Sequence, residues 1–197
     1  MNLPNKITIT RIFLAVLMLV LLLIPWHDLG FDFPTYLFNG ELLNLKYVLA
    51  GVLFIVASLT DFIDGYLARS RNMVTDFGKV ADAIADKILV NGLLIILAYD
   101  RFIPVIVPVI IITRDIVVDS CKMISGEHGK VVVASFLGKA KTMCMMIGLT
   151  LVLFNNLPFS LFNFRLGNIL VLIATILSIV SGCQYYYNVK SILFKNK

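Results

Sequence analysis

Charged residues are scarce in this sequence. Asp, Glu, Lys and Arg make up 15% of its 197 residues, whereas the hydrophobic types make up 59%. A typical soluble domain has about 25% charged residues, so these proportions exclude an ordinary soluble protein. They predict an all-α, polytopic membrane protein in which residues 1–197 form a single membrane domain, without a repeat or a low-complexity tract.

Cysteine and histidine are also scarce. The three cysteines, Cys121, Cys144 and Cys183, lie in apolar segments without paired or metal-like spacing, which is typical of small residues in a membrane core. One of the two histidines, His128, is interpreted as a solvated loop residue. The first apolar run, 7–25, lacks a small-residue cleavage site and is interpreted as a retained span.

Long apolar runs dominate the remainder of the chain. About 20 residues are needed to cross the hydrocarbon core of a bilayer. Six transmembrane helices are expected near 11–26, 44–69, 77–98, 102–125, 136–156 and 166–190. The polar start of the chain, residues 1–10, predicts a short interfacial helix that leads into the first span.

Basic residues are distributed unevenly over the predicted connections. Of the 17 Lys and Arg residues, only Lys46, Arg101 and Arg165 fall on one side of the predicted membrane. Because basic loops stay in the cytoplasm, both termini are expected there, in a multi-pass protein of the cell membrane. The formal net charge of +5 is then explained by orientation, and no nucleic-acid partner is expected.

Four carboxylates stand out against this apolar background. They form two pairs at helical spacing within residues 61–86, namely Asp61 with Asp64 and Asp82 with Asp86. Carboxylates near a bilayer persist when they are protonated, paired with bases or bound to cations. No His or Cys lies in this stretch, so an all-oxygen site for magnesium, manganese or calcium is favoured over a zinc site.

Small residues continue the helical faces that carry these acids. Gly65 and Ala68 follow Asp61 at i+4 and i+7, and Gly78 precedes Asp82 by four residues. Each face thus presents acids beside side chains of minimal bulk. Packing of the helices alone is the alternative explanation for the small residues.

The whole stretch resembles the signature of the CDP-alcohol phosphotransferase family. The pattern D-x2-D-G-x2-A-R-x8-G-x3-D-x3-D is matched at all eight fixed positions, and the basic one is Arg69. The resemblance implies two divalent ions, Mg²⁺ or Mn²⁺, held by Asp61, Asp64, Asp82 and Asp86, with Asp86 as the general base. It also implies a homodimer.

The same resemblance implies a site for the nucleotide substrate. The expected CDP-diacylglycerol-binding residues are Asn5, Thr8, Asp64, Gly65, Ala68, Arg69 and Gly78. Thr8 and Arg11 match a Thr-x-x-Arg pattern that approaches the nucleotide in the family. A cytoplasmic anchor is an equally strong interpretation of Arg11.

A second polar group is expected at the cytoplasmic ends of the fourth and fifth spans. The candidate phosphate-binding residues there are Arg114, Ser135, Lys139, Lys141 and Thr142. Residues 135, 138, 139 and 142 share one helix face, which combines charge, hydroxyl groups and a glycine. Basic residues at these helix ends are also expected for orientation alone.

This second group resembles the S-x-x-G-K-x-K-T segment of bacterial phosphatidylglycerophosphate synthases, and residues 113–115 resemble their G-R-[DE] segment with Thr113 in place of Gly. The resemblance implies an enzyme that transfers the phosphatidyl group of CDP-diacylglycerol to glycerol 3-phosphate, with membrane lipids around it. Inositol phosphate, serine or phosphatidylglycerol as the acceptor are alternatives within the family. A cation transporter remains the alternative from another class.

Overall fold

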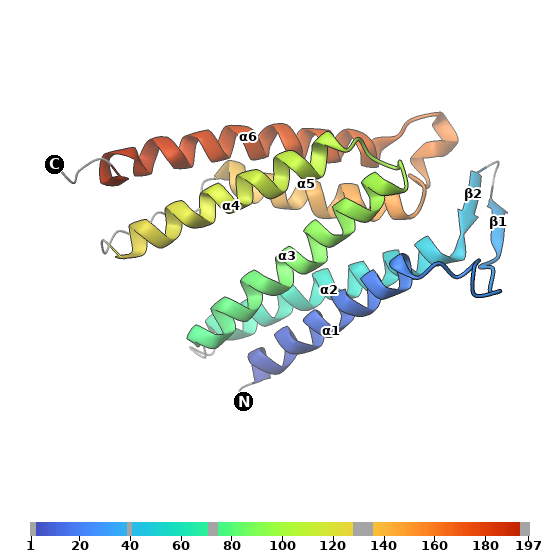
Figure 1. Ribbon diagram of the computed structural model, residues 1–197, viewed down its shortest axis with the longest axis horizontal. Coiled ribbons are helices and arrows are strands. Elements are labelled where there is room, and N and C mark those ends of the chain that lie inside the picture. The colour runs from blue at the N-terminus through green and yellow to red at the C-terminus, as the bar shows by residue number, and fades with distance from the viewer. Residues whose placement is uncertain (1–2, 39–40, 71–74, 128–135, 194–197) are drawn as a thin grey trace.

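The computed structural model describes residues 3–38, 41–70, 75–127 and 136–193, and these are mainly helical (Figure 1). The long helices are α1 (Leu3–Leu23), α2 (Leu45–Ser70), α3 (Asp76–Tyr99), α4 (Ile106–Glu127), α5 (Phe136–Leu153) and α6 (Leu166–Leu193). A one-turn 3-10 helix, η1 (Phe159–Phe162), precedes α6.

Each predicted span coincides with one long helix. The clearest difference is in α1, which runs without a break from Leu3, so that the expected interfacial segment and the first span form one helix. Four of the helices, α1, α2, α5 and α6, are long and apolar enough to cross a membrane. An all-α membrane protein is thus supported, whereas six spans and an interfacial position for the start of α1 stay predictions.

Two short strands between α1 and α2 were not expected. Strand β1 (Thr35–Phe38) pairs antiparallel with β2 (Glu41–Asn44), and Thr35 lies opposite Asn44 in the register. Each strand has only four residues and no alternation of buried and exposed side chains, so it lacks the pattern by which a strand is predicted. The strands lie at the end of the molecule opposite both termini (Figure 1).

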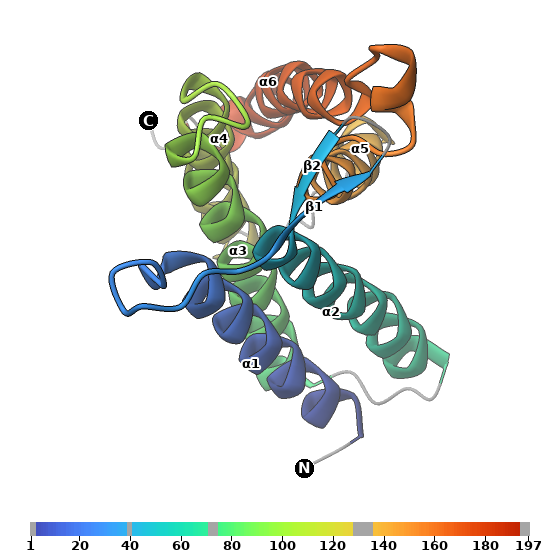
Figure 2. The same cartoon turned by 90° about the vertical axis from the view of Figure 1, so that its right-hand side faces the viewer.

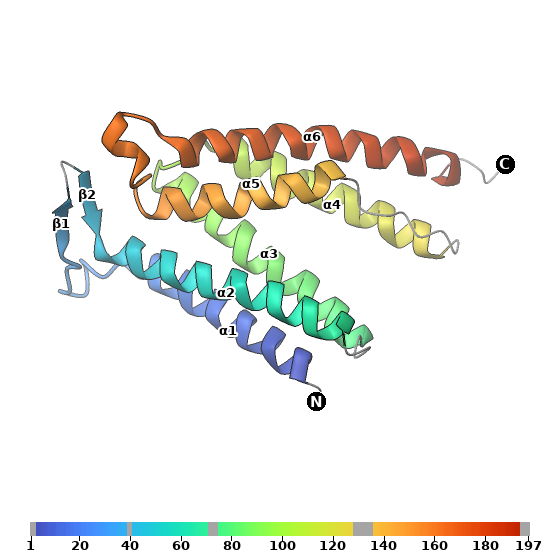
Figure 3. The ribbon, with the colours of Figure 1, turned by 180° about the vertical axis from the view of Figure 1, so that it is seen from behind.

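The helices form two groups of three. Helix α1 packs on α2 and α3, and α6 packs on α4 and α5; contacts of α2 with α5 and of α3 with α4 join the groups. Figure 2 views this arrangement from the strand end, and Figure 3 shows α5 beside α2 from behind. Elements far apart in the sequence therefore meet along the junction between the two groups.

The apolar core lies along this junction. Phe54 of α2, Leu93 of α3, Val107 of α4 and Leu149 of α5 are completely buried within one cluster. Many large apolar side chains on the outside are exposed, as expected of a protein whose exterior faces lipid. Of the cysteines predicted to lie in the core, Cys121 is buried, Cys144 is partly buried and Cys183 is exposed.

Candidate functional site

The first turn of α3 is fixed by a side-chain cap. Thr75 has an extended backbone, and its hydroxyl accepts a hydrogen bond from the backbone N–H of Gly78 at 3.0 Å. The same hydroxyl donates to Oδ1 of Asn5, also at 3.0 Å. A Cβ atom at Gly78 would lie 3.0 Å from that Asn5 oxygen, so the glycine allows α1 to approach α3 closely.

Arg11 joins three helices at this end of the molecule. Its side chain is 1% exposed and forms ion pairs with Asp61 of α2 and Asp82 of α3. Nη2 of Arg11 donates to Oδ1 of Asp82 at 2.7 Å, and the hydroxyl of Thr8 donates to the same oxygen at 3.0 Å. The first polar turns of α1 are therefore part of the acidic site.

This burial argues against a cytoplasmic anchor as the role of Arg11. A cytoplasmic anchor would extend its charge into water. The Arg11 side chain is instead buried, and its guanidinium group forms ion pairs with two acids of the signature. Asn5 and Thr8 are also buried beside it, so that these three polar residues of α1 face the helices that carry the acids, whereas Lys6 and Thr10 are exposed.

The predicted acidic cluster is assembled in part. Asp61 and Asp82 come together around one guanidinium group, whereas Asp86 lies one turn further along α3 and faces a cavity. The side chain of Asp64 is outside the described part of the structure. Among the described residues no group of three His, Cys, Asp or Glu is placed to hold a metal ion.

A cavity of about 330 Å³ lies between α3, α4, α5 and α6. Its lining includes Asp86, Lys87, Arg114, Asp115, Asp119, Lys122, Gly138, Lys139, Lys141 and Thr142. Both polar groups predicted from the sequence thus contribute to one space. Positive side chains outnumber the acids along its wall, which makes the cavity suited to an anion.

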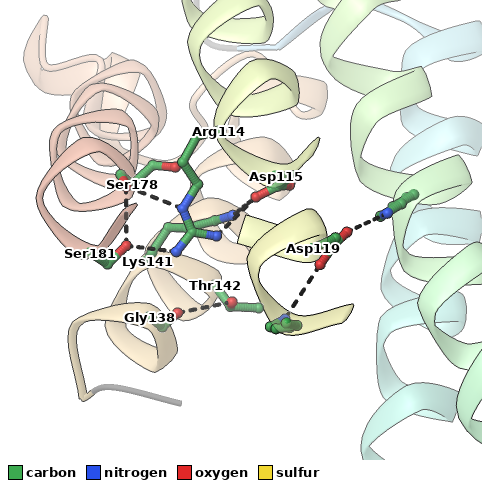
Figure 4. A network of polar contacts seen from close by, with 10 residues as sticks. Arg114, Asp115, Asp119, Gly138, Lys141, Thr142, Ser178 and Ser181 are labelled. Carbon is green, nitrogen blue, oxygen red and sulfur yellow. Dashed lines mark hydrogen bonds and ion pairs between the residues drawn. The ribbon is translucent and has the colours of Figure 1, made fainter. Parts of the chain in front are cut away.

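The carboxylate of Asp115 binds two of these cations. Oδ1 of Asp115 accepts hydrogen bonds from Nη1 of Arg114 and from Nζ of Lys141, both at 3.0 Å (Figure 4). Asp119, one turn along α4, pairs with Lys87 of α3 and with Lys122. The cationic wall is therefore held in place by two acids, Asp115 and Asp119, that the predicted phosphate-binding set does not include.

The other predicted phosphate ligands differ in their placement. Lys139 is exposed where α5 borders the cavity, and the hydroxyl of Thr142 donates to the carbonyl oxygen of Gly138 at 3.1 Å. Ser135 lies outside the described residues. Arg114, Lys139, Lys141 and Thr142 thus all line one cavity.

Of the predicted nucleotide-binding residues on α2, only some side chains belong to the described part of the structure. Gly65 is partly buried, and the side chains of Ala68 and Arg69 are outside the described part of the structure. Beside this end of α2, an apolar groove of about 430 Å³ runs between α2 and α5. Asp61 and Thr142 both line it, so the groove adjoins both polar groups.

Sequence reasoning missed a polar face on α6. Ser178 and Ser181 are buried there and contact Arg114, and Gly182 lies against its side chain. These residues and Tyr185 have the spacing i, i+3, i+4, i+7, the same spacing that identified the face on α5. The signal was present, but serine and glycine are ordinary in transmembrane helices and did not stand out.

Comparison with known proteins yields one consistent result. The family described as CDP-alcohol phosphatidyltransferase matches residues 1–180. The chain is 38% identical to the CDP-diacylglycerol–glycerol-3-phosphate 3-phosphatidyltransferase of Bacillus subtilis over 185 residues, 94% of this chain and 93% of that protein. It is 33% identical to the enzyme of that name from Rickettsia bellii over 186 residues, 94% and 93% of the two chains.

Proposed function

Because the chain belongs to the CDP-alcohol phosphatidyltransferase family, we propose that it transfers the phosphatidyl group of CDP-diacylglycerol to sn-glycerol 3-phosphate, giving phosphatidylglycerophosphate and CMP. The cavity between α3 and α6 is the observation that carries this assignment. It places Asp86, an acid of the signature, in one space with Arg114 and Lys141. An acceptor with both a phosphate and a hydroxyl group matches that combination.

The acceptor phosphate would bind on the cationic side of this cavity. Arg114 and Lys141 are the proposed principal contacts, with Lys139 at the exposed rim and Ser135 and Thr142 as hydroxyl donors. Charge-assisted hydrogen bonds to phosphate are stronger than neutral ones, and a guanidinium can bind two oxygens at once. Asp115 keeps the two principal cations together despite their like charge.

Asp86 is the proposed general base. The C1 hydroxyl oxygen of the acceptor would attack the phosphorus of the phosphatidyl group, the bond from that phosphorus to the CMP oxygen would break, and Asp86 would take the hydroxyl proton. A positioned base of this kind contributes about 10²–10⁴-fold in rate. Asp86 lies on α3 and lines the same cavity as Arg114 and Lys141, which supports the role.

Divalent ions are part of the proposal, with Mg²⁺ or Mn²⁺ held by Asp61, Asp64, Asp82 and Asp86. The donor set fits, because it consists of carboxylate oxygens, and because Asp61 and Asp82 already approach one cationic group, the guanidinium of Arg11. When bound, such ions neutralise the pyrophosphate and stabilise the leaving CMP. Arg11 keeps the two carboxylates directed to one point.

CDP-diacylglycerol would bind where α1, α2 and α3 meet. Asn5, Thr8, Asp64, Gly65, Ala68, Arg69 and Gly78 are the proposed contacts. The burial of Asn5, and of Thr8 with its hydroxyl on Asp82, supports this location. The side-chain oxygen of Asn5 lies directly beside Gly78. The apolar groove between α2 and α5 offers a path for the acyl chains from lipid to Asp61.

The arrangement in the membrane is proposed on the same basis. Residues 1–197 would form a single domain with six spans, and both termini and the site would face the cytoplasm. Both termini lie at the end that carries the acidic site, opposite the strands (Figure 1), which supports this orientation. Homodimerisation belongs to the proposal through the family resemblance alone.

A panel of acceptors tests the proposed reaction. Purified protein is incubated with CDP-diacylglycerol, Mg²⁺ and one acceptor at a time: glycerol 3-phosphate, inositol phosphate, serine or phosphatidylglycerol. We expect CMP release with glycerol 3-phosphate and none above background with the others, and the Asp86→Asn variant is the inactive control. Release of CMP with another acceptor, and not with glycerol 3-phosphate, would overturn the assignment.

A further inference from the structure

One face of α6 contacts Arg114 along the length of its side chain (Figure 4). The face consists of Ser178, Ser181 and Gly182, and we refer to it as the α6 serine face. Ser178 is completely buried and Ser181 is 1% exposed. None of these residues belongs to the acidic signature or to the phosphate-binding segment recognised in the sequence.

The contacts orient the guanidinium group. Nε of Arg114 donates to the carbonyl oxygen of Ser178 at 3.2 Å, and Nη2 donates to the hydroxyl of Ser181 at 2.9 Å. That hydroxyl in turn donates to the carbonyl oxygen of Ser178 at 3.1 Å. Because the Ser181 hydroxyl gives its own proton to the Ser178 carbonyl oxygen, its oxygen presents a lone pair to Nη2 of Arg114.

Gly182 provides the room for this arrangement. A Cβ atom at this position would lie 2.9 Å from Cγ of Arg114 and 3.4 Å from its Nε. Any larger residue would push the side chain of Arg114 away from α6. The glycine and the serine therefore act on the same side chain, one on its stem and the other on its charged end.

The remaining edge of the guanidinium faces the cavity. Nη1 of Arg114 donates to Asp115, which also binds Lys141. A guanidinium has five N–H donors, and the contacts with Ser178, Ser181 and Asp115 use three of them. In the described part of the chain no further contact engages the other two, and Arg114 lines the cavity that contains Lys139 and Lys141.

We propose that the α6 serine face positions Arg114 for binding of the acceptor phosphate, with Ser181 and Gly182 as positioning residues that act through Arg114. This inference rests on the proposed function, since it needs a phosphate-bearing acceptor in the cavity. A guanidinium held on three sides loses little further freedom when it binds a phosphate, which favours affinity. The face therefore tunes the affinity for the acceptor and leaves the chemical step to Asp86.

Steady-state kinetics of Ser181→Ala test the proposal, with each substrate varied in turn. We expect KM for glycerol 3-phosphate to rise roughly three- to tenfold, the range of one ordinary hydrogen bond, because Ser181 acts on the phosphate only through Arg114. The kcat and the KM for CDP-diacylglycerol should change less than about twofold. Ser181→Thr, which keeps the hydroxyl, should recover most of the affinity. Gly182→Ala should raise the same KM, because it displaces the Arg114 stem.

Thr175→Val is the matched control on the same helix. Thr175 lies about one turn before Ser178 in α6 and is also buried, but its hydroxyl donates to the carbonyl oxygen of Val171. Its removal should leave KM for glycerol 3-phosphate unchanged. If Ser181→Ala and Thr175→Val lower the melting temperature alike and leave KM unaffected, the serine face is merely structural and the proposal is wrong.

A double-mutant cycle with Arg114→Ala provides the decisive test. If Ser181 acts through Arg114, Ser181→Ala should raise KM no further in the Arg114→Ala background; independent, multiplicative effects would overturn the proposal. Should the wild-type protein use inositol phosphate instead of glycerol 3-phosphate, the proposed function fails and the cycle is run with inositol phosphate. Turnover with acceptors that lack a phosphate, and only with those, would overturn both.

Discussion

Nη2 of Arg11 donates a hydrogen bond to Oδ1 of Asp82 at 2.7 Å, although the Arg11 side chain is only 1% exposed. The same guanidinium pairs with Asp61, so a single buried cation links α1 to α2 and α3, the two helices that carry the acids. Its Nε has no partner among the described residues. The two carboxylates therefore account for the contacts that hold the Arg11 charge inside the protein.

Replacement of Arg11 should destabilise the protein most when divalent ions are absent. In Arg11→Ala the carboxylates of Asp61 and Asp82 lose their shared cation and repel each other, so we expect the melting temperature in EDTA to fall by about 5 °C or more. Mg²⁺ should restore part of the loss by supplying positive charge between the acids. Thermal unfolding in detergent, with and without Mg²⁺, measures both effects.

Lys6→Ala is the control for this experiment, because Lys6 is an exposed cation on the same helix. It should change the melting temperature little under either condition. Equal melting temperatures for Arg11→Ala and Lys6→Ala in EDTA would show that Arg11 has no special role in the acidic site.

Chelation of divalent ions should abolish turnover. If carboxylates of the signature hold Mg²⁺ or Mn²⁺, excess EDTA removes the charge that stabilises the pyrophosphate and the departing CMP. CMP release should stop in EDTA and return when either ion is added in excess. Undiminished turnover in EDTA would contradict the proposed metal site.

Three acids of the signature should each be needed for catalysis. Asp61→Asn, Asp82→Asn and Asp86→Asn should each lower the rate by at least about 10²-fold, because a neutral amide replaces neither a charged ligand nor a base. Asp76→Asn, in the first turn of α3 and outside the signature, should stay within a few fold of the wild type. Near-normal turnover by Asp86→Asn would eliminate it as the base.

The two lysines of α5 should differ in their effect on acceptor binding. Lys141 is partly buried and held by Asp115, whereas Lys139 is exposed. We expect Lys141→Ala to raise KM for glycerol 3-phosphate by about 10–150-fold, as for loss of a charge-assisted contact, and Lys139→Ala to raise it less.

The KM for CDP-diacylglycerol should remain nearly constant in both lysine variants, because neither residue belongs to the acidic site. Arg165→Ala is a suitable control, since this exposed arginine directly precedes α6. The first turn of α6 lies toward the strand end of the molecule (Figure 1). An equal rise of both KM values in Lys141→Ala would indicate a general structural effect instead of a phosphate contact.

The helices and the composition of the site could be predicted because their signals are local. A run of about 20 apolar residues is a property of the chain itself, and so is the helical spacing of Asp82 and Asp86. Strands β1 and β2 could not be predicted, since their pairing stabilises a segment that has no buried face.

By itself, the sequence determined the apolar helices, the acids on one face of each of two helices, and the basic residues near Arg114 and Lys141. The tertiary structure decided which of these groups meet. Arg11 lies 71 positions from Asp82 in the chain, and Arg114 lies 67 from Ser181. Local periodicity shows which residues share a helix face, but the partners of a buried charge are set by which helices pack together, because a charge inside the bundle must find its counter-charges and acceptors there.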